Sequence, residues 1–148
     1  MINEFQGKWT VFSNFVPCSI TYKGILYPTT EHAYMSAKSD SLEWKETCSN
    51  FQLRPGAVKK LGRKVQLRSD WEEVKEQVME DVLRLKFSQP KFKHILLETG
   101  NEVIQEGNYW NDKIWGVCLK TGVGKNLLGK LLMKIRTEYQ ENENIIIS

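Results

Sequence analysis

Glu31, Tyr34 and Lys38 are polar residues whose spacing could bring them together for a reaction. They lie at i, i+3 and i+7, so on a helix they would stack along one face. A carboxylate aligned with an amine could carry protons while the amine acts as a nucleophile. A solvated polar stripe is the commoner outcome of such a pattern, and the spacing alone favours it.

A second group lies in a loop predicted over residues 106–116. Two tryptophans, Trp110 and Trp115, flank Asp112 there, and loops between strands are where ligand-binding residues concentrate. Aromatic walls beside a carboxylate suit a flat, polar ring such as a nucleobase. A loop that packs its own aromatic residues fits the pattern equally well.

Residues 121–126 form a glycine-rich stretch that contains a Gly-Lys pair. A P-loop needs a glycine five positions before that pair and Ser or Thr after it, but Leu119 and Asn126 occupy these positions. A nucleoside triphosphatase is therefore excluded. What remains is a turn that could hold a phosphate at a helix N-terminus or could simply reverse the chain. Arg63 and Arg68 could clamp a phosphate with their planar guanidinium groups, although surface arginines are common.

The 148-residue length and the hydrophobic fraction of 41% predict one core and one domain. We place this domain at 1–139 and a polar C-terminal tail at 140–148. The chain does not begin like a signal peptide, and no apolar run approaches the roughly 18 residues that span a bilayer. We therefore expect a cytoplasmic protein without a membrane partner.

Charge and cysteine content limit the function further. The net charge of +3 permits a phosphate-bearing substrate without demanding a nucleic acid, because duplex-binding domains are usually far more basic. The chain has three cysteines, Cys18, Cys48 and Cys118, which is an odd number, and only two histidines that could act with them as metal ligands. Buried free thiols are therefore expected rather than disulfides or a zinc site.

Helical patterns outnumber strand patterns, which predicts an α+β fold: a helix-rich single domain with a small, mostly antiparallel sheet. A proline, two hydroxyls and a carboxylate at 28–31 predict a helix over 30–39. A capping box of Ser69 and Glu72 predicts a helix that continues to Phe87. Further helices are expected over 42–51, after Pro55, after Pro90 and over 125–139. Strands are expected at 9–12, 19–22, 26–27, 102–105 and 114–119. A glycine turn at 22–25 is expected to join strands 19–22 and 26–27 in a hairpin.

Ordered blocks across nearly the whole chain resemble the NADAR family, also called YbiA-like. The blocks are Phe12-Ser13-Asn14-Phe15, Tyr27-Pro28-Thr29-Thr30-Glu31-His32-Ala33-Tyr34, Ala37-Lys38, Leu61-Gly62-Arg63, Leu67-Arg68-Ser69-Asp70-Trp71, Lys86-Phe87, Leu96-Leu97-Glu98-Thr99-Gly100, Asp112, Trp115-Gly116 and Gly124-Lys125-Asn126-Leu127-Leu128-Gly129-Lys130-Leu131-Leu132-Met133. The sequence departs from the family at Asn108-Tyr109-Trp110, where many members look more like Ser-Pro, so its pocket wall is expected to differ.

The resemblance implies an N-glycosidase of α+β fold, and neither of the two routes considered below needs a metal or redox cofactor. Two substrate branches are known in such proteins: phosphorylated ribosylaminopyrimidines, which are intermediates of riboflavin synthesis, and ADP-ribosylated guanine, including guanine in nucleic acid. The competing hypotheses are a module that binds ADP-ribose or a related nucleotide without cleaving it, and a purely structural role. Oligomeric state is left open.

Both substrate branches join ribose C1 to an exocyclic amine, which can be cleaved in two ways. A carboxylate can stabilise an oxocarbenium-like centre while another group protonates the leaving nitrogen. Alternatively, the sugar ring opens to an imine and a lysine exchanges onto C1. The expected catalytic residues are Glu31, Lys38 and Asp112. The expected substrate-binding residues are Asn14, Phe15, Tyr34, Arg63, Trp110, Trp115 and Asn126.

Overall fold

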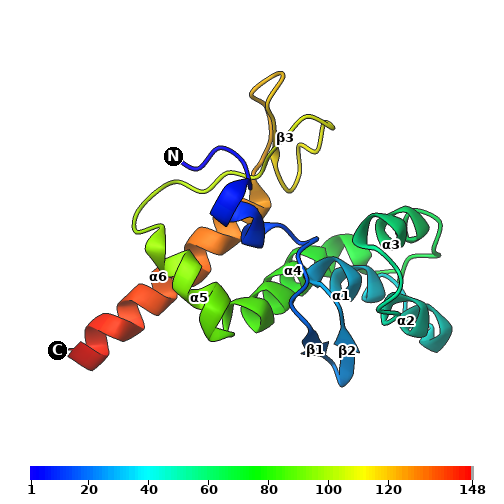
Figure 1. Cartoon of the computed structure of the whole chain (residues 1–148). Helices are drawn as coiled ribbons and strands as arrows, with labels where there is room; N and C mark the ends of the chain where they lie inside the picture. Colours follow the sequence, from blue (N-terminus) through cyan, green and yellow to red (C-terminus); the bar gives the residue numbers. More distant parts are fainter. Residues whose placement is uncertain (148) are drawn as a thin grey trace. The chain divides into compact units, whose positions relative to one another are not determined.

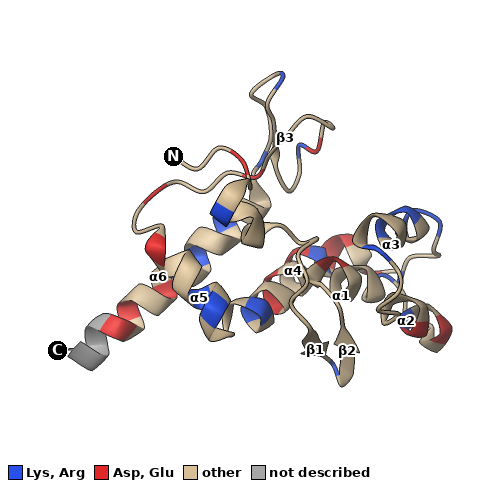
Figure 2. Cartoon of the chain, in the orientation of Figure 1, with Lys and Arg blue, Asp and Glu red and all other residues tan. Residues whose placement is uncertain are grey.

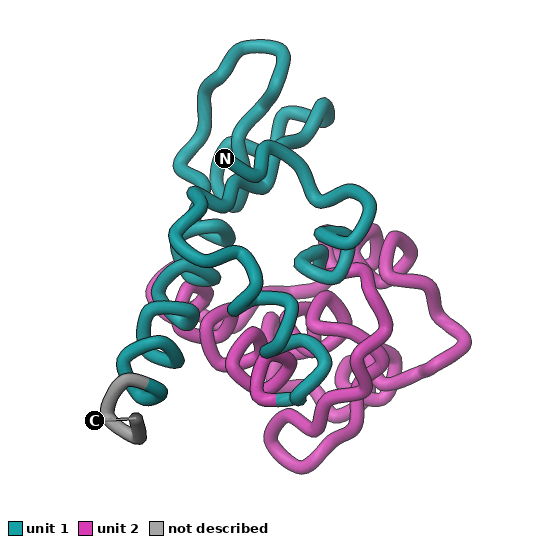
Figure 3. Tube along the Cα trace, turned by 60° about the vertical axis from the view of Figure 1, so that its left-hand side comes forward, with its two compact units in different colours: residues 1–13, 89–148 teal, residues 14–88 magenta. Residues whose placement is uncertain are grey.

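The computed structural model describes residues 1–147, with side chains through residue 143. These residues form two compact units, which Figure 3 colours separately. Unit 1 combines Met1–Ser13 with Gln89–Ser148, and unit 2 is the continuous segment Asn14–Ser88. The helix-rich α+β class predicted from the sequence is confirmed, since helices dominate both units and the strands are short.

Unit 2 begins with the predicted hairpin. Strands β1 (Ile20–Tyr22) and β2 (Ile25–Tyr27) pair in antiparallel register, with Tyr22 opposite Ile25. The two turn residues, Lys23 and Gly24, have φ values of 50° and 85°. Positive φ at both central positions is what a tight two-residue hairpin turn requires, and glycine supplies one of them without strain.

Four helices complete unit 2: α1 (Thr30–Ser36), α2 (Leu42–Cys48), α3 (Pro55–Gly62) and α4 (Trp71–Phe87). All seven residues of α1 are buried, because α2, α3, α4 and the hairpin pack around it (Figure 1). A helix buried on every side is held in one position by its neighbours. Side chains carried by α1 are therefore held firmly within this unit.

The start of α4 corrects one prediction. The N-cap residue is Asp70, not Ser69, and it makes no side-chain capping bond. Arg68 accounts for the missing capping bond, since its Nε and Nη2 donate to the two Asp70 carboxylate oxygens at 2.5 and 3.0 Å. A carboxylate held in this bidentate pair is not available to cap the helix.

The N-terminal segment of unit 1 corrects another prediction. Residues 9–12, expected as a strand, belong to the 3₁₀ helix η1 (Gly7–Phe12). The three-residue turn brings Trp9 over Phe12 at 5.7 Å between ring centroids, and Phe5 meets the same ring edge-on. Packing of these rings against one another outweighs their preference for strands.

The remaining strands of unit 1 are shorter than expected. The segment predicted at 102–105 makes only an isolated parallel bridge, Ile2 with Ile104. Strands β3 (Gly107–Asn108) and β4 (Val117–Cys118) form a two-residue parallel pair, so the sheet content is not wholly antiparallel. Loop residues separate these short pairs, and the loop backbone bonds to itself and to α6 instead of to a longer ladder.

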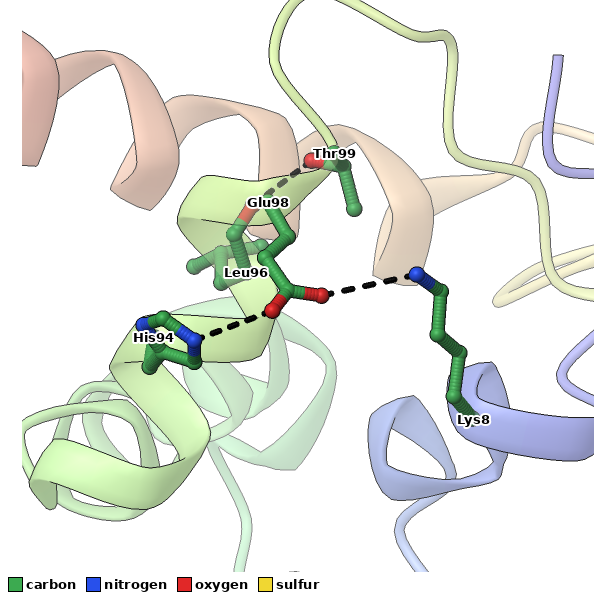
Figure 4. A network of polar contacts seen from close by, with 5 residues as sticks. All are labelled: Lys8, His94, Leu96, Glu98 and Thr99. Atoms are coloured by element: carbon green, nitrogen blue, oxygen red, sulfur yellow. Dashed lines mark hydrogen bonds and ion pairs between the residues drawn. The ribbon is translucent and has the colours of Figure 1, made fainter.

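Two helices, α5 (Pro90–Glu98) and α6 (Leu127–Ile147), supply the rest of unit 1. The Glu98 carboxylate accepts from Lys8 on η1 at 3.5 Å and pairs with His94 on α5 at 2.9 Å (Figure 4). The backbone of α6 continues beyond the predicted end at 139 through Ile147, and Ser148 lies outside the described residues. The boundary between domain and tail stays a prediction. Within residues 1–147, no helix combines the length and apolar character needed to cross a membrane.

Candidate active site

The first turn of α1 is fixed by Thr29 and His32. Thr29 is the N-cap, and its hydroxyl accepts from the His32 backbone N–H at 3.1 Å. The His32 ring is fully buried, with Nδ1 2.7 Å from the Thr29 hydroxyl and Nε2 2.6 Å from the Leu53 carbonyl. Burial lowers the pKa of His32, so the ring is neutral and its Nε2–H donates to Leu53. His32 therefore has a structural role.

Asn14 links the N-terminus of α1 to the preceding segment by hydrogen bonds. Its side-chain oxygen accepts from the Thr30 hydroxyl at 2.7 Å, and its backbone carbonyl accepts from the Glu31 N–H at 3.1 Å. The side-chain amide contacts the Met79 sulfur at 3.4 Å. Asn14, predicted to bind substrate, is thus a buried residue that positions Glu31.

Glu31 and Tyr34 lie in the interior of unit 2, which rules out the solvated stripe. Each side chain is only 6% exposed. The Tyr34 ring packs against Trp71 of α4, with 5.2 Å between ring centroids and a tilted geometry. Burying a charged carboxylate costs free energy, so partners within the protein must stabilise the Glu31 carboxylate.

Lys38 follows the end of α1 instead of lying on it. The helix ends at Ser36, and the N–H groups of Ala37 and Lys38 bond to the Tyr34 and Met35 carbonyls in a tight turn. Lys38 Nζ donates to the carbonyl of Gly62, the last residue of α3, at 3.2 Å. A Cβ at Gly62 would be in ordinary contact with Nζ at 3.6 Å but would clash with the Met35 sulfur, so glycine here leaves room for the Met35 side chain.

The environment of Lys38 lowers the pKa of its amine. Burial is the main cause, and the positive charges of Arg63, Lys59 and Lys75 lower it further. The Glu31 carboxylate acts in the opposite direction and raises it. An amine with a lowered pKa is neutral, and hence nucleophilic, at a lower pH than an ordinary lysine.

Two other predicted binding residues of unit 2 lie at its surface. Arg63, just after α3, is exposed, and Phe15 is 43% exposed. Lys59 lies over the Phe15 ring at 5.9 Å from the centroid. Both residues are accessible to a ligand, and Arg63 is near enough to Lys38 to influence its protonation.

In unit 1, Asp112 organises the loop that carries it. One carboxylate oxygen accepts from the Ile114 and Trp115 N–H groups at 3.1 and 3.0 Å. Asn108 bonds to both the N–H and the carbonyl of Asp112. Asp112 is half-buried, so it combines a structural role with partial access to solvent. Its predicted catalytic role remains a prediction.

The same loop forms one wall of a groove in unit 1. Trp110 is 66% exposed at its edge, whereas Trp115 is half-buried. The groove has a volume of about 320 Å³, which is within the range of small-molecule sites. Its lining residues are Glu4, Phe5, Gln6, Ser13, Glu106, Gly107, Tyr109 and Trp110. The N-terminal residues of this lining were not predicted, because nothing in the sequence links residues 4–6 to the loop.

Asn126 and the glycine-rich turn are already occupied by the protein itself. The Asn126 side chain accepts from the Glu106 N–H and donates to the Ile104 carbonyl. The first N–H groups of α6, those of Leu127 and Leu128, donate to the carbonyls of Ile114 and Trp115. These N–H groups are therefore not available to a phosphate, and the bond pattern favours the simple turn.

The structure thus brings the predicted residues into two groups. Unit 2 holds Asn14, Phe15, Glu31, Tyr34, Lys38 and Arg63, and unit 1 holds Trp110, Asp112, Trp115 and Asn126. Gly62, Lys59 and Lys75 influence Lys38 without having been assigned a role from the sequence. Among the described residues, no three His, Cys, Asp or Glu side chains are arranged to hold a metal ion.

Comparison with known proteins gives a consistent result. A family model described as the NADAR domain matches residues 3–140. N-glycosidase YbiA of Escherichia coli is 37% identical over 130 residues, which cover 86% of this chain and 79% of that protein. A riboflavin biosynthesis protein of Vibrio vulnificus is 36% identical over 133 residues, which cover 88% of this chain but 35% of that protein. The chain therefore spans about a third of the length of the Vibrio relative.

A solved structure supports the same relationship. The NMR structure of the E. coli protein YbiA has a TM-score of 0.83 and 33% sequence identity, and it covers 97% of this chain and 89% of that one. An N-glycosidase of Nostoc punctiforme is 35% identical over 134 residues, covering 87% of this chain and 85% of that protein.

Proposed function

The chain belongs to the NADAR domain family, and we propose that it is an N-glycosidase whose reacting groups are Lys38 and Glu31. The bond hydrolysed joins C1 of a ribose phosphate unit to an exocyclic amine of a nucleobase-like ring. Relatives that are named N-glycosidases, at 37% and 35% identity, support this reaction class. The cytoplasmic location expected from the sequence is part of the proposal.

The arrangement of Glu31 and Lys38 within unit 2 is the observation that carries the proposal. The carboxylate is buried, and the amine has a lowered pKa that this carboxylate opposes. A module that only bound a nucleotide would need aromatic and phosphate contacts. It would gain nothing from an amine whose pKa is lowered by burial.

Lys38 suits the route that passes through an imine. In the substrate, opening the ribose ring breaks the bond between C1 and the ring oxygen, which takes up a proton, and leaves a C1=N bond to the base amine. The neutral Lys38 amine adds to C1, and a proton moves from Nζ to the base nitrogen. As the C1–N bond breaks, a second proton moves from Nζ to the base nitrogen, so the base departs as a neutral amine and a C1=Nζ imine remains. Water hydrolyses the remaining imine between Lys38 and C1, which restores the lysine.

Glu31 is the proposed proton carrier of this sequence. It accepts the proton that Nζ loses on attack and returns it to the departing nitrogen. Its burial strengthens electrostatic interactions with both groups, because the local dielectric is low. Tyr34, three residues after Glu31 on α1, packs its ring against Trp71.

The positive charges around Lys38 support a phosphate-bearing substrate. Lys59, Arg63 and Lys75 all act on the Lys38 amine, so they add positive potential near it, which the Glu31 carboxylate opposes. Such a potential attracts a ribose phosphate or the diphosphate of ADP-ribose. It is equally suited to both substrate branches, the ribosylaminopyrimidine phosphate and ADP-ribosylated guanine.

Direct cleavage is the competing route. There a carboxylate would stabilise an oxocarbenium-like centre and Lys38 would not form a bond. Asp112 belongs to unit 1, and its predicted part in either route is retained as a proposal. The lowered pKa of Lys38 favours the imine route, since direct cleavage has no need of a neutral amine.

The first test is turnover by variants of the two reacting groups. Purified protein is incubated with the ribosylaminopyrimidine phosphate and, separately, with ADP-ribosylguanosine, and the released sugar phosphate is followed by mass spectrometry. Lys38→Met and Glu31→Gln are expected to lower kcat by about 10²–10⁴-fold on whichever substrate is cleaved. The matched control is Lys91→Met, an exposed lysine of unit 1.

Three results would contradict the proposal. One is wild-type turnover by both folded variants, and another is equal loss in Lys91→Met. The third is retention of intact ligand by a protein that binds both compounds, which would assign the chain to the non-catalytic binding module.

A further inference from the structure

The groove of unit 1 combines acidic and aromatic side chains. Two carboxylates, those of Glu4 and Glu106, line it together with the rings of Phe5, Tyr109 and Trp110. None of the residues that line it is Lys, Arg or His. The groove therefore presents carboxylates and aromatic rings to a ligand and offers it no cationic side chain.

The first lysine of the N-terminal segment does not offset the charge of Glu4. Lys8 pairs with Glu98 of α5 at 3.5 Å and lies over the Trp9 ring, 4.6 Å from its centroid. Across the part of the chain that the structure describes, Glu4 forms no ion pair. Figure 2 shows red on the N-terminal segment where it approaches β3. The Glu4 carboxylate is thus available to a positively charged ligand.

Close packing of two backbone segments holds the walls of the groove in place. The Ile2 N–H donates to the Val103 carbonyl at 2.8 Å, and the Gln105 N–H donates to the Ile2 carbonyl at 2.9 Å. Gly107, the first residue of β3, leaves room for the Asn3 carbonyl, because a Cβ at this position would overlap that oxygen. A ligand would therefore not have to order these walls when it binds.

Two of the lining residues are themselves fixed by neighbours within unit 1. The Glu106 N–H donates to the Asn126 side chain at 3.0 Å, and the Glu106 carbonyl accepts from the Val117 N–H at 2.9 Å. The Phe5 ring meets Phe12 edge-on, with 5.7 Å between ring centroids. One carboxylate and one ring of the groove are therefore carried by well-anchored residues.

Packing within the protein does not account for Tyr109 and Trp110. These adjacent residues are 56% and 66% exposed at the edge of the groove, so much of each ring is left in water. The face of an aromatic ring carries negative charge density and attracts a cation. The rings and the carboxylates thus favour the same sign of ligand charge for two different physical reasons.

The lining also indicates which class of cation fits. An anion such as a ribose phosphate would meet two carboxylates and no cationic side chain to offset them. The described residues include no group of three His, Cys, Asp or Glu side chains that could hold a metal ion. The volume of about 320 Å³ is in the range of small-molecule sites, and the rings provide apolar surface for an organic body. An organic ammonium ion satisfies all of these conditions.

We propose that the groove of unit 1 binds a small organic cation, a protonated amine whose ammonium group pairs with Glu4 and Glu106 and whose apolar body lies against Tyr109 and Trp110. The proposal uses residues of unit 1 only and does not rest on the proposed function. It gives Trp110, which was expected from the sequence to bind substrate, a ligand of the opposite charge to a sugar phosphate.

The test uses benzylamine as the probe and benzyl alcohol as its neutral counterpart. Each is titrated into ¹⁵N-labelled wild-type protein, and amide chemical shifts are followed by NMR. Benzylamine should give saturable shifts at residues 4–6 and 106–110, and benzyl alcohol should bind about 5-fold more weakly or less. Ribose 5-phosphate should leave the same amides in place. Absence of saturable shifts with benzylamine, equal affinity for benzyl alcohol, or binding of ribose 5-phosphate at these amides would overturn the proposal.

Variants assign the binding to its two kinds of contact. Glu4→Gln and Trp110→Ala are each expected to weaken benzylamine binding by about 2–5-fold. The matched controls are Glu141→Gln, an exposed acid of unit 1 outside the groove, and Phe51→Ala, a 51% exposed ring of unit 2. Both controls should bind benzylamine as the wild type does. Equal weakening in the controls, or unchanged affinity in both groove variants, would show that the groove is not the site.

Discussion

At the scale of single residues, Lys38 combines a nucleophilic group with an environment that lowers its pKa. Burial acts first, and Arg63 adds positive charge nearby. The amine loses its proton as pH rises, so kcat is expected to increase with pH and to level off once Lys38 is neutral. The midpoint should lie below the ordinary lysine pKa of about 10.4. A pH–rate profile of the wild type measures it.

Arg63→Gln gives this prediction its control. Removing the positive charge raises the pKa of Lys38, so the midpoint should move to higher pH. Lys120→Gln, an exposed substitution in unit 1, should leave the midpoint in place. A midpoint unaffected by Arg63→Gln would mean that another group controls the rate.

Lys86 is a second lysine with an altered pKa, and its effect is on stability. It is fully buried, and burial lowers its pKa to about 8 from 10.5. Between these values the unfolded chain binds more protons than the folded one, so the free energy of unfolding rises with pH across this window. Below about 8 the full cost of burying the charged amine remains. Urea denaturation at several pH values should show this rise.

Lys86→Met isolates the contribution of Lys86 to that rise. Methionine has a similar length and no charge, so the variant should lack the part of the increase that Lys86 causes. Other groups that titrate in alkali, such as the Cys48 thiol with its pKa raised to about 12, act in both proteins and cancel in the comparison. Identical pH dependence in the two proteins would contradict the assignment.

At the scale of elements, α1 depends on its N-cap. Thr29→Ala removes the hydroxyl that bonds to both the backbone and the ring of His32. The free energy of unfolding should fall by about 1–2 kcal/mol. Ser41→Ala removes the corresponding cap of α2, where the bond to Trp44 is exposed and 3.3 Å long, so its cost should be smaller. Urea denaturation of both variants compares them, and an equal or larger loss at Ser41 would contradict the account.

Several helix starts could be predicted from local chemistry, as could the end of α4 at Phe87, but the end of α1 could not. Thr29, Pro55 and Pro90 each mark a start that the structure confirms. The end of α1 at Ser36 depends instead on Trp44 and other groups of α2. The Trp44 indole N–H donates to the Met35 carbonyl at 2.8 Å, so a residue outside the helix completes its last turn. Such contacts depend on packing and leave no local signal.

In the candidate site too, local sequence features could be predicted, whereas features that depend on packing could not. The spacing of Glu31, Tyr34 and Lys38 was readable from the sequence, and so was the family, which is confirmed. Burial was not readable, because α2, α3 and α4 together exclude solvent from α1. The bond from Lys38 to Gly62 joins residues 24 positions apart, so it also could not be predicted.

At the scale of the whole molecule, charge distribution is more informative than total charge. A net charge of +3 alone permits either substrate branch. The segment between Glu46 and Asp70 contains no Asp or Glu, and its Lys59 and Arg63 act on the proposed nucleophile within one unit. A local field of this kind concentrates anionic substrate where the chemistry occurs.

The most direct measurement of the central claim is trapping of the covalent intermediate during turnover. Sodium borohydride is added to enzyme that is cleaving its substrate, and the protein is analysed by intact mass and peptide mapping. The account predicts a reduced ribose phosphate adduct on Lys38, absent without substrate and absent in Lys38→Met. Rapid turnover with no adduct on Lys38, together with an active Lys38→Met variant, would contradict it.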